Sequence, residues 1–139
     1  MLTLYEFALS GNCHKVRLLL SLLGVRYQSQ PVDAAARQHK SAGFLALNPL
    51  GQVPVLCDGE HCLRDSQAIL CYLARRYDAS GQWLPQDALV QARIVGWLSL
   101  AAGEVSRGPA ALRLHYKWGR AIDTTDAEAA TQQVLTLLE

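Results

Sequence analysis

The stretch "QVPVLCDGEHCLRDSQAILCYLARRY", residues 52–77, carries the clearest fold signal in the sequence. Two β-prone segments meet at Asp58-Gly59, a dipeptide typical of tight hairpin turns, so they predict an antiparallel hairpin. Asp65 and Ser66, two residue types favoured at helix N-termini, then introduce an amphipathic segment that runs to Tyr77. A hairpin followed directly by a helix predicts a sheet with a helix covering one of its faces.

The sequence before this stretch predicts a second layer of the same domain. Residues 2–7 alternate between polar and apolar types, as a short strand does, and residues 14–24 form a leucine-rich helical pattern that Gly24 ends. Residues 25–33 predict a second strand, which Pro31 places near an edge of the sheet. A short helix follows around residues 41–47. Residues 1–78 therefore predict an α/β domain with the element order β-α-β-α-β-β-α.

The composition and the hydrophobic pattern of the sequence change after residue 78. Residues 79–86 contain Gly81 and Pro85 and predict a linker. Residues 87–139 are rich in Ala and Leu and show no strand pattern, so we expect an all-α second domain with helices over residues 88–105, 109–118 and 126–139. The last helical pattern reaches the final residue without a stop signal, and we expect this second domain to be incomplete.

Composition and charge narrow the function classes. Half of the 139 residues are hydrophobic, 18% are charged and the formal net charge is +1. The Lys and Arg residues are scattered, so we expect no nucleic-acid partner. The first residues lack the pattern of a signal peptide, and no apolar run approaches the roughly 20 residues of a membrane span, so we expect a cytoplasmic protein without a membrane partner.

The four cysteines are expected as free thiols, since cytosolic reductants keep thiols reduced. Their spacings match no zinc-binding pattern, and we expect no metal. Cys57 and Cys62 flank the hairpin turn and could face each other across it. We expect them instead to be two small core residues, as free cysteines commonly are.

Three short stretches carry residues suited to binding a thiol-containing peptide. Ser10 to Cys13 stand where the first helix starts, and unpaired N–H groups at such a position favour an anion such as a thiolate. Val53-Pro54 opens a strand in a setting that suits a cis peptide bond, which would leave the Val53 backbone free to pair with an extended peptide. Asp65-Ser66 starts another helix, where a carboxylate and an amine could both be held. Glutathione fits this combination.

Four segments resemble the cytosolic glutathione S-transferases, most closely the theta-like and related bacterial branch: "LSGNCHKVRLLL", "QHKSAGFLALNPLGQVPVL", "LRDSQAILCYLARRY" and "WLPQDALVQARI". The resemblance covers residues 1 to about 100 strongly and the rest loosely. It implies a thioredoxin-like N-terminal domain, an all-α C-terminal domain and a homodimer. Family chains are longer than this one, in agreement with an incomplete second domain.

The resemblance implies a role for each matching position. Ser10 would donate a hydrogen bond to the glutathione sulfur as the catalytic residue, because such a bond stabilises the thiolate form. The other glutathione contacts would come from Asn12, Cys13, His39, Lys40, Gln52, Val53, Pro54, Asp65 and Ser66. Within that set, His39 and Lys40 would approach the glycine carboxylate, and Asp65 stands where many relatives have Glu.

Three functions remain open at this point. The leading one is a transferase that adds the glutathione thiolate to small hydrophobic electrophiles, with glutathione as co-substrate and no other cofactor. A glutathione-dependent disulfide reductase or peroxidase is favoured if Asn12 or Cys13 controls the sulfur, and the fold also serves as a non-catalytic binding module. Tyr5 is expected to pack in the first strand.

The second domain offers further candidate residues. Glu104 could reach the γ-glutamyl amine bound by a partner subunit. The candidates for lining the electrophile pocket are Arg107, Leu112, His115 and Tyr116.

Overall fold

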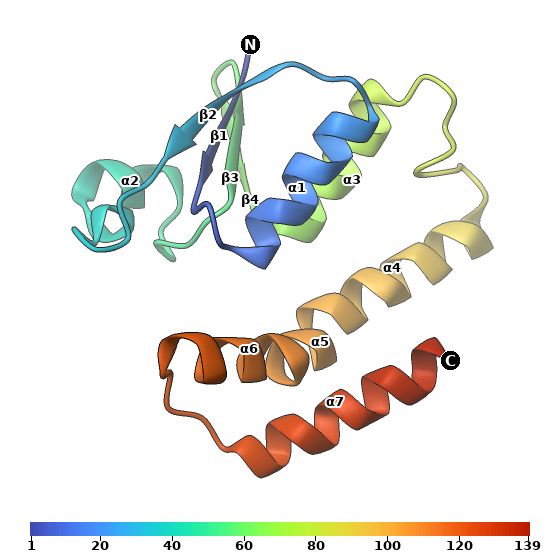
Figure 1. The fold of residues 1–139 in the computed structure, drawn as a ribbon. Coiled ribbons are helices and arrows are strands. Elements are labelled where there is room, and N and C mark those ends of the chain that lie inside the picture. The colour runs from blue at the N-terminus through green and yellow to red at the C-terminus, as the bar shows by residue number, and fades with distance from the viewer. The chain divides into compact units, whose positions relative to one another are not determined.

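The computed structural model describes residues 1–139, which divide into two compact units, Met1–Pro85 and Gln86–Glu139 (Figure 1). The first unit has the element order predicted from the sequence, with one short 3₁₀ turn, η1, added before α2. Its elements are β1 (Leu2–Glu6), α1 (Gly11–Leu22), β2 (Tyr27–Pro31), η1 (Gln38–Lys40), α2 (Ala42–Leu47), β3 (Val55–Asp58), β4 (His61–Arg64) and α3 (Ser66–Tyr77).

The four strands form one mixed sheet in the order β2-β1-β3-β4. β1 and β2 are parallel, whereas β1 with β3 and β3 with β4 are antiparallel. β2 lies at the edge and ends at Pro31, as the sequence predicts, because a proline has no N–H to donate to a further strand. The parallel crossover through α1 and the β3–β4 hairpin together give a thioredoxin-like arrangement.

Each face of this sheet has its own apolar cluster. α1 and α3 lie side by side against one face (Figure 1), where the core consists of Leu2, Leu4, Val16, Leu19, Leu20, Leu56, Ile69 and Leu73. A smaller cluster lies on the other face, beneath α2, and consists of Val32, Phe44, Val55 and Cys57 with Tyr5, Phe7, Leu47 and Val53 around them. Alternation along β3 explains the split, since neighbouring strand residues point to opposite faces.

The second unit is entirely helical, as expected. It contains α4 (Ala88–Ala102), α5 (Glu104–Arg107), α6 (Pro109–Trp118) and α7 (Thr124–Leu138). The buried residues of α7 are Ala127, Ala130 and Val134, which share one helical face by their spacing of three and four. Gly108 lies against the α7 backbone, where a Cβ atom would approach the Thr131 nitrogen to 2.9 Å.

In the second unit, two helices have boundaries that differ from the sequence prediction. The helix expected over residues 88–105 ends at Ala102, because Gly103 adopts a non-helical conformation and α5 begins after it. The last helix begins at Thr124, two residues before the expected start, because the Asp123 side chain accepts hydrogen bonds from the backbone N–H groups of Thr125 and Asp126. An N-cap of this kind fixes where a helix begins.

By length and composition alone, one helical stretch, Ala88–Trp118, could cross a membrane. The structure interrupts it at Gly103 and Gly108, and both glycines have non-helical backbone angles. The longest uninterrupted piece, α4, has 15 residues. At 1.5 Å per residue it is about 22 Å long, shorter than the roughly 30 Å core of a bilayer.

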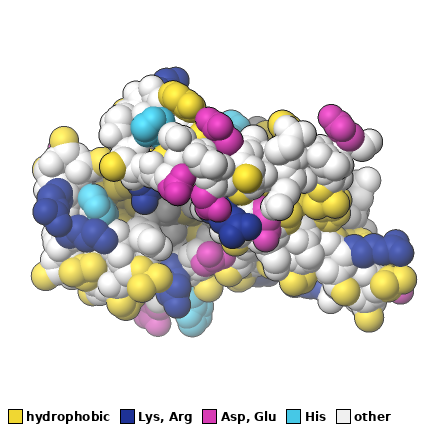
Figure 2. All heavy atoms as spheres, turned by 90° about the horizontal axis from the view of Figure 1, so that it is seen from below, with side chains coloured by type: hydrophobic (Ala, Val, Ile, Leu, Met, Phe, Trp, Pro, Cys, Tyr) yellow, Lys and Arg dark blue, Asp and Glu magenta, His cyan; other side chains and the backbone are white.

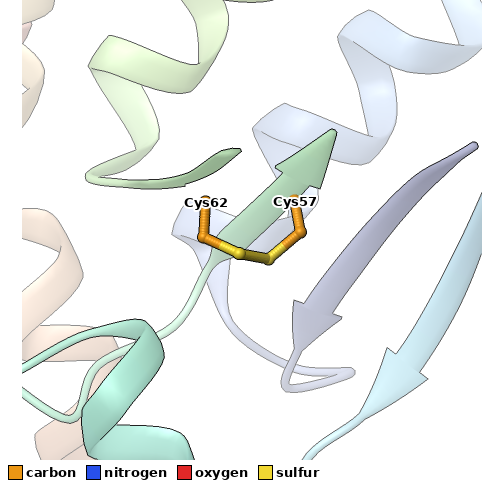
Figure 3. Close-up of a disulfide and its surroundings, with 2 residues drawn as sticks. All are labelled: Cys57 and Cys62. Carbon is orange, nitrogen blue, oxygen red and sulfur yellow. A yellow bond between two sulfur atoms is a disulfide. The ribbon is translucent and has the colours of Figure 1, made fainter. Parts of the chain in front are cut away.

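The expectation that Cys57 and Cys62 are free thiols is wrong, because they form a disulfide across the β3–β4 hairpin (Figure 3). The antiparallel register places the two residues directly opposite each other, with their Cα atoms 4.1 Å apart. Directly opposite residues on one face of such a pair are close enough to be bridged. Cys13 and Cys71 remain free.

Candidate functional site

The sheet register brings the three candidate stretches to one end of the sheet. Val55 in β3 is paired with Tyr5 in β1 and with Arg64 in β4. Extending this register by one residue places Pro54 level with Glu6, at the end of β1, and with Asp65, just after β4. The loop that leads to α1, the start of β3 and the start of α3 therefore meet at this end.

Ser10 is the N-cap of α1 and is half-buried. Its Oγ accepts a hydrogen bond from the backbone N–H of Cys13 at 3.3 Å. This bond orients the hydroxyl at the helix N-terminus and uses only one of its acceptor lone pairs, so the hydroxyl proton can be donated either to the buried Cys13 thiol or to a ligand. A hydroxyl proton beside the positive end of a helix can stabilise a bound thiolate.

The loop before Ser10 is held by a buried carboxylate. Glu6 is buried, forms an ion pair with Arg17 of α1 and accepts a hydrogen bond from the Ser29 hydroxyl at 2.6 Å. Arg17 also donates to the Ala8 carbonyl at 3.0 Å. The arginine thus connects the end of β1, the loop and α1, and it sets where Ser10 lies. The sequence analysis missed this pair, whose only local signal is an acidic residue within a short β-prone segment.

Asn12 and Cys13 lie differently although they are adjacent. Asn12 is exposed beside Ser10, whereas the Cys13 side chain is fully buried. Burial raises the pKa of the Cys13 thiol, and hydrogen bonding from Ser10 and the Phe7 backbone offsets only part of that rise. A buried, protonated thiol is a poor nucleophile. The arrangement gives no physical support to a disulfide reductase that would depend on Cys13.

The segment before β3 has the expected cis peptide bond between Val53 and Pro54. Val53 is half-buried, and its backbone N–H and C=O make no hydrogen bond within the chain. Gln52, next to it, is exposed. An extended peptide could therefore pair with the main chain of Val53.

Asn48 and Lys40 hold the loop that leads to Gln52. The buried Asn48 side chain donates to the Gln52 carbonyl at 2.8 Å and accepts from the Leu50 N–H at 3.1 Å. The Lys40 ammonium donates to the carbonyls of Leu50 and Gly51, both at 2.9 Å. Lys40 thus holds the loop that leads to Gln52, a role that the resemblance did not imply. Asn48 was not among the sequence candidates, because an Asn before Pro is also an ordinary helix stop.

His39 lies in η1 and packs edge-on against Phe7, with ring centroids 5.3 Å apart. Its Nδ1 atom is buried and has no hydrogen-bond partner in the chain. Phe7 follows β1 directly, so the imidazole is placed at the same end of the sheet as Ser10 and Pro54. An unpartnered ring nitrogen at that position is suited to meeting a polar group of a ligand.

Asp65 is the N-cap of α3, and its Oδ1 accepts from the N–H groups of Gln67 at 2.9 Å and Ala68 at 3.1 Å. The second carboxylate oxygen stays available at an exposed position. Ser66 is buried, and its hydroxyl donates to Gln67 at 2.5 Å. Lys15 of α1 donates to the same Gln67 oxygen at 3.2 Å. Lys15 and Gln67 were missed from the sequence, since nothing local shows that α1 and α3 meet here.

The candidates after residue 86 all belong to the second unit and stay predictions. Glu104 and Leu112 are half-buried, and Arg107 is exposed. His115 stacks edge-on with Tyr116, and its Nδ1 lies 2.8 Å from the Arg120 carbonyl. These contacts stabilise the end of α6 and assign no ligand to it.

The strand order, the mixed sheet and the cis proline at the start of β3 define a thioredoxin-like domain followed by a helical unit. A sequence model described as "Glutathione S-transferase, N-terminal domain" matches residues 1–75. The chain belongs to the glutathione S-transferase family.

Known relatives agree with this assignment. The chain is 38% identical over 99 residues to glutathione S-transferase 3 of Zea mays, a match that covers 71% of this chain and 45% of that protein. It is 38% identical over 98 residues to human glutathione S-transferase theta-1, covering 70% of this chain and 41% of that one. Human glutathione transferase theta-2, solved in complex with glutathione and an unknown ligand, superposes with a TM-score of 0.85 at 30% identity, over 100% of this chain and 60% of that chain. The chain thus spans less than half the length of the two curated relatives.

Proposed function

We propose that this chain binds glutathione at the sheet end formed by Ser10, Val53 and Asp65 and activates its thiol for transfer to a small hydrophobic electrophile. The observation that carries the proposal is the Ser10 hydroxyl, which is oriented by the Cys13 N–H at the start of α1 and whose proton can turn from the buried Cys13 thiol to a bound sulfur. The theta-2 structure named above contains glutathione, which supports this choice of ligand.

Each part of the tripeptide has a matching group in this arrangement. The main chain of its cysteinyl residue would pair with the N–H and C=O of Val53. The γ-glutamyl amine would meet the second oxygen of Asp65, and the γ-glutamyl carboxylate would meet the backbone N–H of Ser66, which the Asp65 side chain does not engage. The glycine carboxylate would approach His39. Asn12 and Gln52, both exposed at the rim, would add polar contacts.

The energetic demand on Ser10 is small. An ordinary thiol has a pKa of about 8.5, so most of it is protonated at neutral pH. Lowering that pKa by about two units requires about 2.7 kcal/mol of preferential stabilisation of the thiolate. One charge-assisted hydrogen bond contributes roughly 1.5–3 kcal/mol, and the helix N-terminus adds to it. Ser10 need not act as a nucleophile itself.

The test compares Ser10→Ala with Ser41→Ala. Ser41 caps α2 as Ser10 caps α1, because its Oγ accepts from the Phe44 N–H at 3.3 Å, so both variants lose an equivalent cap. Ultraviolet titration of bound glutathione should show the thiol pKa rising by about two units in Ser10→Ala only. Calorimetry with S-methylglutathione, which has no ionisable thiol, should give the same Kd for both variants. Equal thiol pKa values in the two variants would refute the role of Ser10.

Turnover decides between a transferase and a binding module. With an aryl halide as electrophile, we expect conjugate formation that falls in Ser10→Ala in proportion to the lost thiolate. Glutathione binding without any turnover would favour the module. We also propose, with the family, that the chain acts as a cytosolic homodimer, which sedimentation analysis would check.

A further inference from the structure

The Cys57–Cys62 disulfide lies outside the candidate glutathione site. Cys57 is three residues beyond Pro54 along β3, which corresponds to about 10 Å of strand. It pairs with Thr3 near the start of β1, whereas the candidate site lies beyond the end of that strand. The bridge therefore stands next to the hairpin turn and does not face the Ser10 hydroxyl.

The two cysteines of the disulfide differ sharply in their exposure to solvent. Cys57 is 9% exposed and belongs to the apolar cluster beneath α2. Cys62 is exposed on β4, an edge strand that no further strand covers. A thiol or disulfide reagent from solution can reach the Cys62 sulfur and not its partner.

The free cysteines of the chain are worse placed for such chemistry. Cys13 is fully buried, and Cys71 is only partly exposed. Burial raises the pKa of both thiols, which reduces their thiolate fraction. A pair with one accessible sulfur and one adjacent buried sulfur is the usual layout of a reacting and a resolving cysteine.

We propose that Cys57 and Cys62 are a redox-active pair that exchanges with glutathione and glutathione disulfide, with Cys62 as the sulfur that reacts first. In the reduced chain, the Cys62 thiolate attacks one sulfur of glutathione disulfide, forms a mixed disulfide and releases one glutathione thiolate. The Cys57 thiolate then attacks the Cys62 sulfur and releases the second glutathione. Two electrons pass from the cysteine pair to glutathione disulfide, and the two thiol protons go to solvent or to the released glutathione. In the reverse direction, a glutathione thiolate attacks Cys62 of the bridge and releases the Cys57 thiolate, and a second glutathione thiolate then attacks the glutathione sulfur of the mixed disulfide, which releases the Cys62 thiolate and glutathione disulfide.

Trypsin digestion isolates this pair. Cleavage after Lys40 and Arg64 gives a peptide of residues 41–64 that contains Cys57 and Cys62 and neither of the free cysteines. The full chain is reduced, freed of reductant, exposed to glutathione disulfide, trapped with N-ethylmaleimide and digested. We expect the 41–64 peptide to become internally bridged, with both glutathione equivalents released. An unmodified 41–64 peptide beside glutathionylated 1–15 or 65–75 peptides would overturn the proposal.

Single variants identify the first sulfur. Cys57→Ser should retain a stable glutathionyl group on Cys62, and Cys62→Ser should acquire one on Cys57 at a rate roughly tenfold lower. Cys71→Ser is the matched control and should bridge like the wild type. Maleimide labelling of the reduced wild type measures the relative reactivity of the two thiols without any substitution. We expect Cys62 to be labelled first, and faster labelling of Cys57 than of Cys62 would contradict the assignment. Saturation with S-methylglutathione should leave the exchange rate unchanged, so this result is independent of whether the proposed transferase site is correct.

Discussion

The Lys15 ammonium lies 3.2 Å from Oε1 of Gln67, and this contact joins α1 to the first turn of α3. Burial lowers the pKa of Lys15 below its ordinary value of 10.5, and the nearby Asp65 carboxylate offsets part of that shift. The folded state therefore disfavours the charged lysine relative to the unfolded chain. The Lys15 ammonium nevertheless lies against the first turn of α3, beside the residues proposed to hold the γ-glutamyl group.

Lys15→Met tests the cost of burying the charged lysine through the pH dependence of the free energy of unfolding. Because the folded pKa is lowered, the cost of the charged form is fully present below that pKa and is relieved as the pH rises through it towards 10.5. We expect the wild type to gain free energy of unfolding relative to Lys15→Met over that window, measured by urea unfolding at a series of pH values. Lys117→Met, which removes a lysine at an exposed position, is the comparison variant. A flat difference for Lys15→Met would contradict the burial effect.

Gly51→Ala should disrupt the loop that leads to Pro54. Gly51 has a φ of +57°, and a Cβ atom there would meet the His39 carbonyl at 2.6 Å and Lys40 Nζ at 2.8 Å. A backbone carbonyl cannot move away as a side chain can, so we expect a loss of roughly 3 kcal/mol or more of unfolding free energy. Glutathione binding should weaken as well, since the same loop presents Val53.

Gly59→Ala is the control that separates the cost of the left-handed backbone conformation from the cost of a steric clash. Gly59 has a φ of +61°, but an added Cβ atom would meet nothing within 4 Å. We expect a cost of about 1 kcal/mol from the left-handed conformation alone. Chemical unfolding of both variants measures the difference, and equal losses would mean that the contact with His39 and Lys40 contributes nothing.

The fold of the first unit could be predicted because its signals are local. Asp58-Gly59 marks the turn, Asp65 caps α3, and the apolar spacing in residues 14–24 identifies the helix, so the element order follows without long-range information. The second unit was harder to predict in detail. Gly103 ends α4 although the apolar pattern continues beyond it, and an isolated glycine in a helical pattern does not by itself fix a boundary.

The candidate site was predictable only where its residues stand at element starts. Ser10 and Asp65 cap helices, and Pro54 opens a strand, so sequence position alone identifies them as candidates. Lys15 and Arg17 act through contacts between elements, and such contacts depend on the tertiary packing. Asn48 makes local contacts with Leu50 and Gln52, but its sequence signal, an Asn before Pro, is also that of an ordinary helix stop. The disulfide depended on strand register, because a shift of one residue would have placed Cys57 and Cys62 on opposite faces of the sheet.

Asp58 should stabilise the hairpin in a pH-dependent way. Its Oδ2 accepts hydrogen bonds from the hydroxyls of Tyr72 at 2.7 Å and Tyr77 at 2.9 Å, which attach the turn to α3. These two bonds, Tyr72 first, hold the pKa of Asp58 below its ordinary value of 3.8. A lowered carboxylate pKa contributes stability that is present above the unfolded value and is lost as the pH falls through the folded pKa.

Asp58→Asn tests this contribution. We expect a lower free energy of unfolding than the wild type at neutral pH, and a difference that narrows as the pH falls from about 4 towards the folded pKa. Tyr72→Phe should show the same pH trend with a smaller amplitude, because Tyr77 still donates to the carboxylate. Unfolding followed by circular dichroism at each pH measures both. A difference that widens on acidification would show that the carboxylate is not the stabilising form.

Reduction of the Cys57–Cys62 bridge should destabilise the first unit by a modest amount. The closed loop covers residues 57–62, and the loss of chain entropy in the unfolded state predicts about 2 kcal/mol for so short a loop. For a unit of this size the corresponding fall in Tm is about 10 °C. The β3–β4 ladder still holds the hairpin in the reduced chain, so we expect the unit to stay folded and only its Tm to fall.

The Cys57→Ser/Cys62→Ser double variant should show the same fall in Tm without added reductant and no further change when reductant is present. Cys71→Ser keeps the bridge and should respond to reductant as the wild type does. If reductant leaves the Tm of the wild type unchanged while labelling shows that both sulfurs have become thiols, the bridge contributes nothing to stability. Its role would then lie in the exchange chemistry alone, since Cys62 stays accessible on the edge strand whether or not the bond constrains the hairpin.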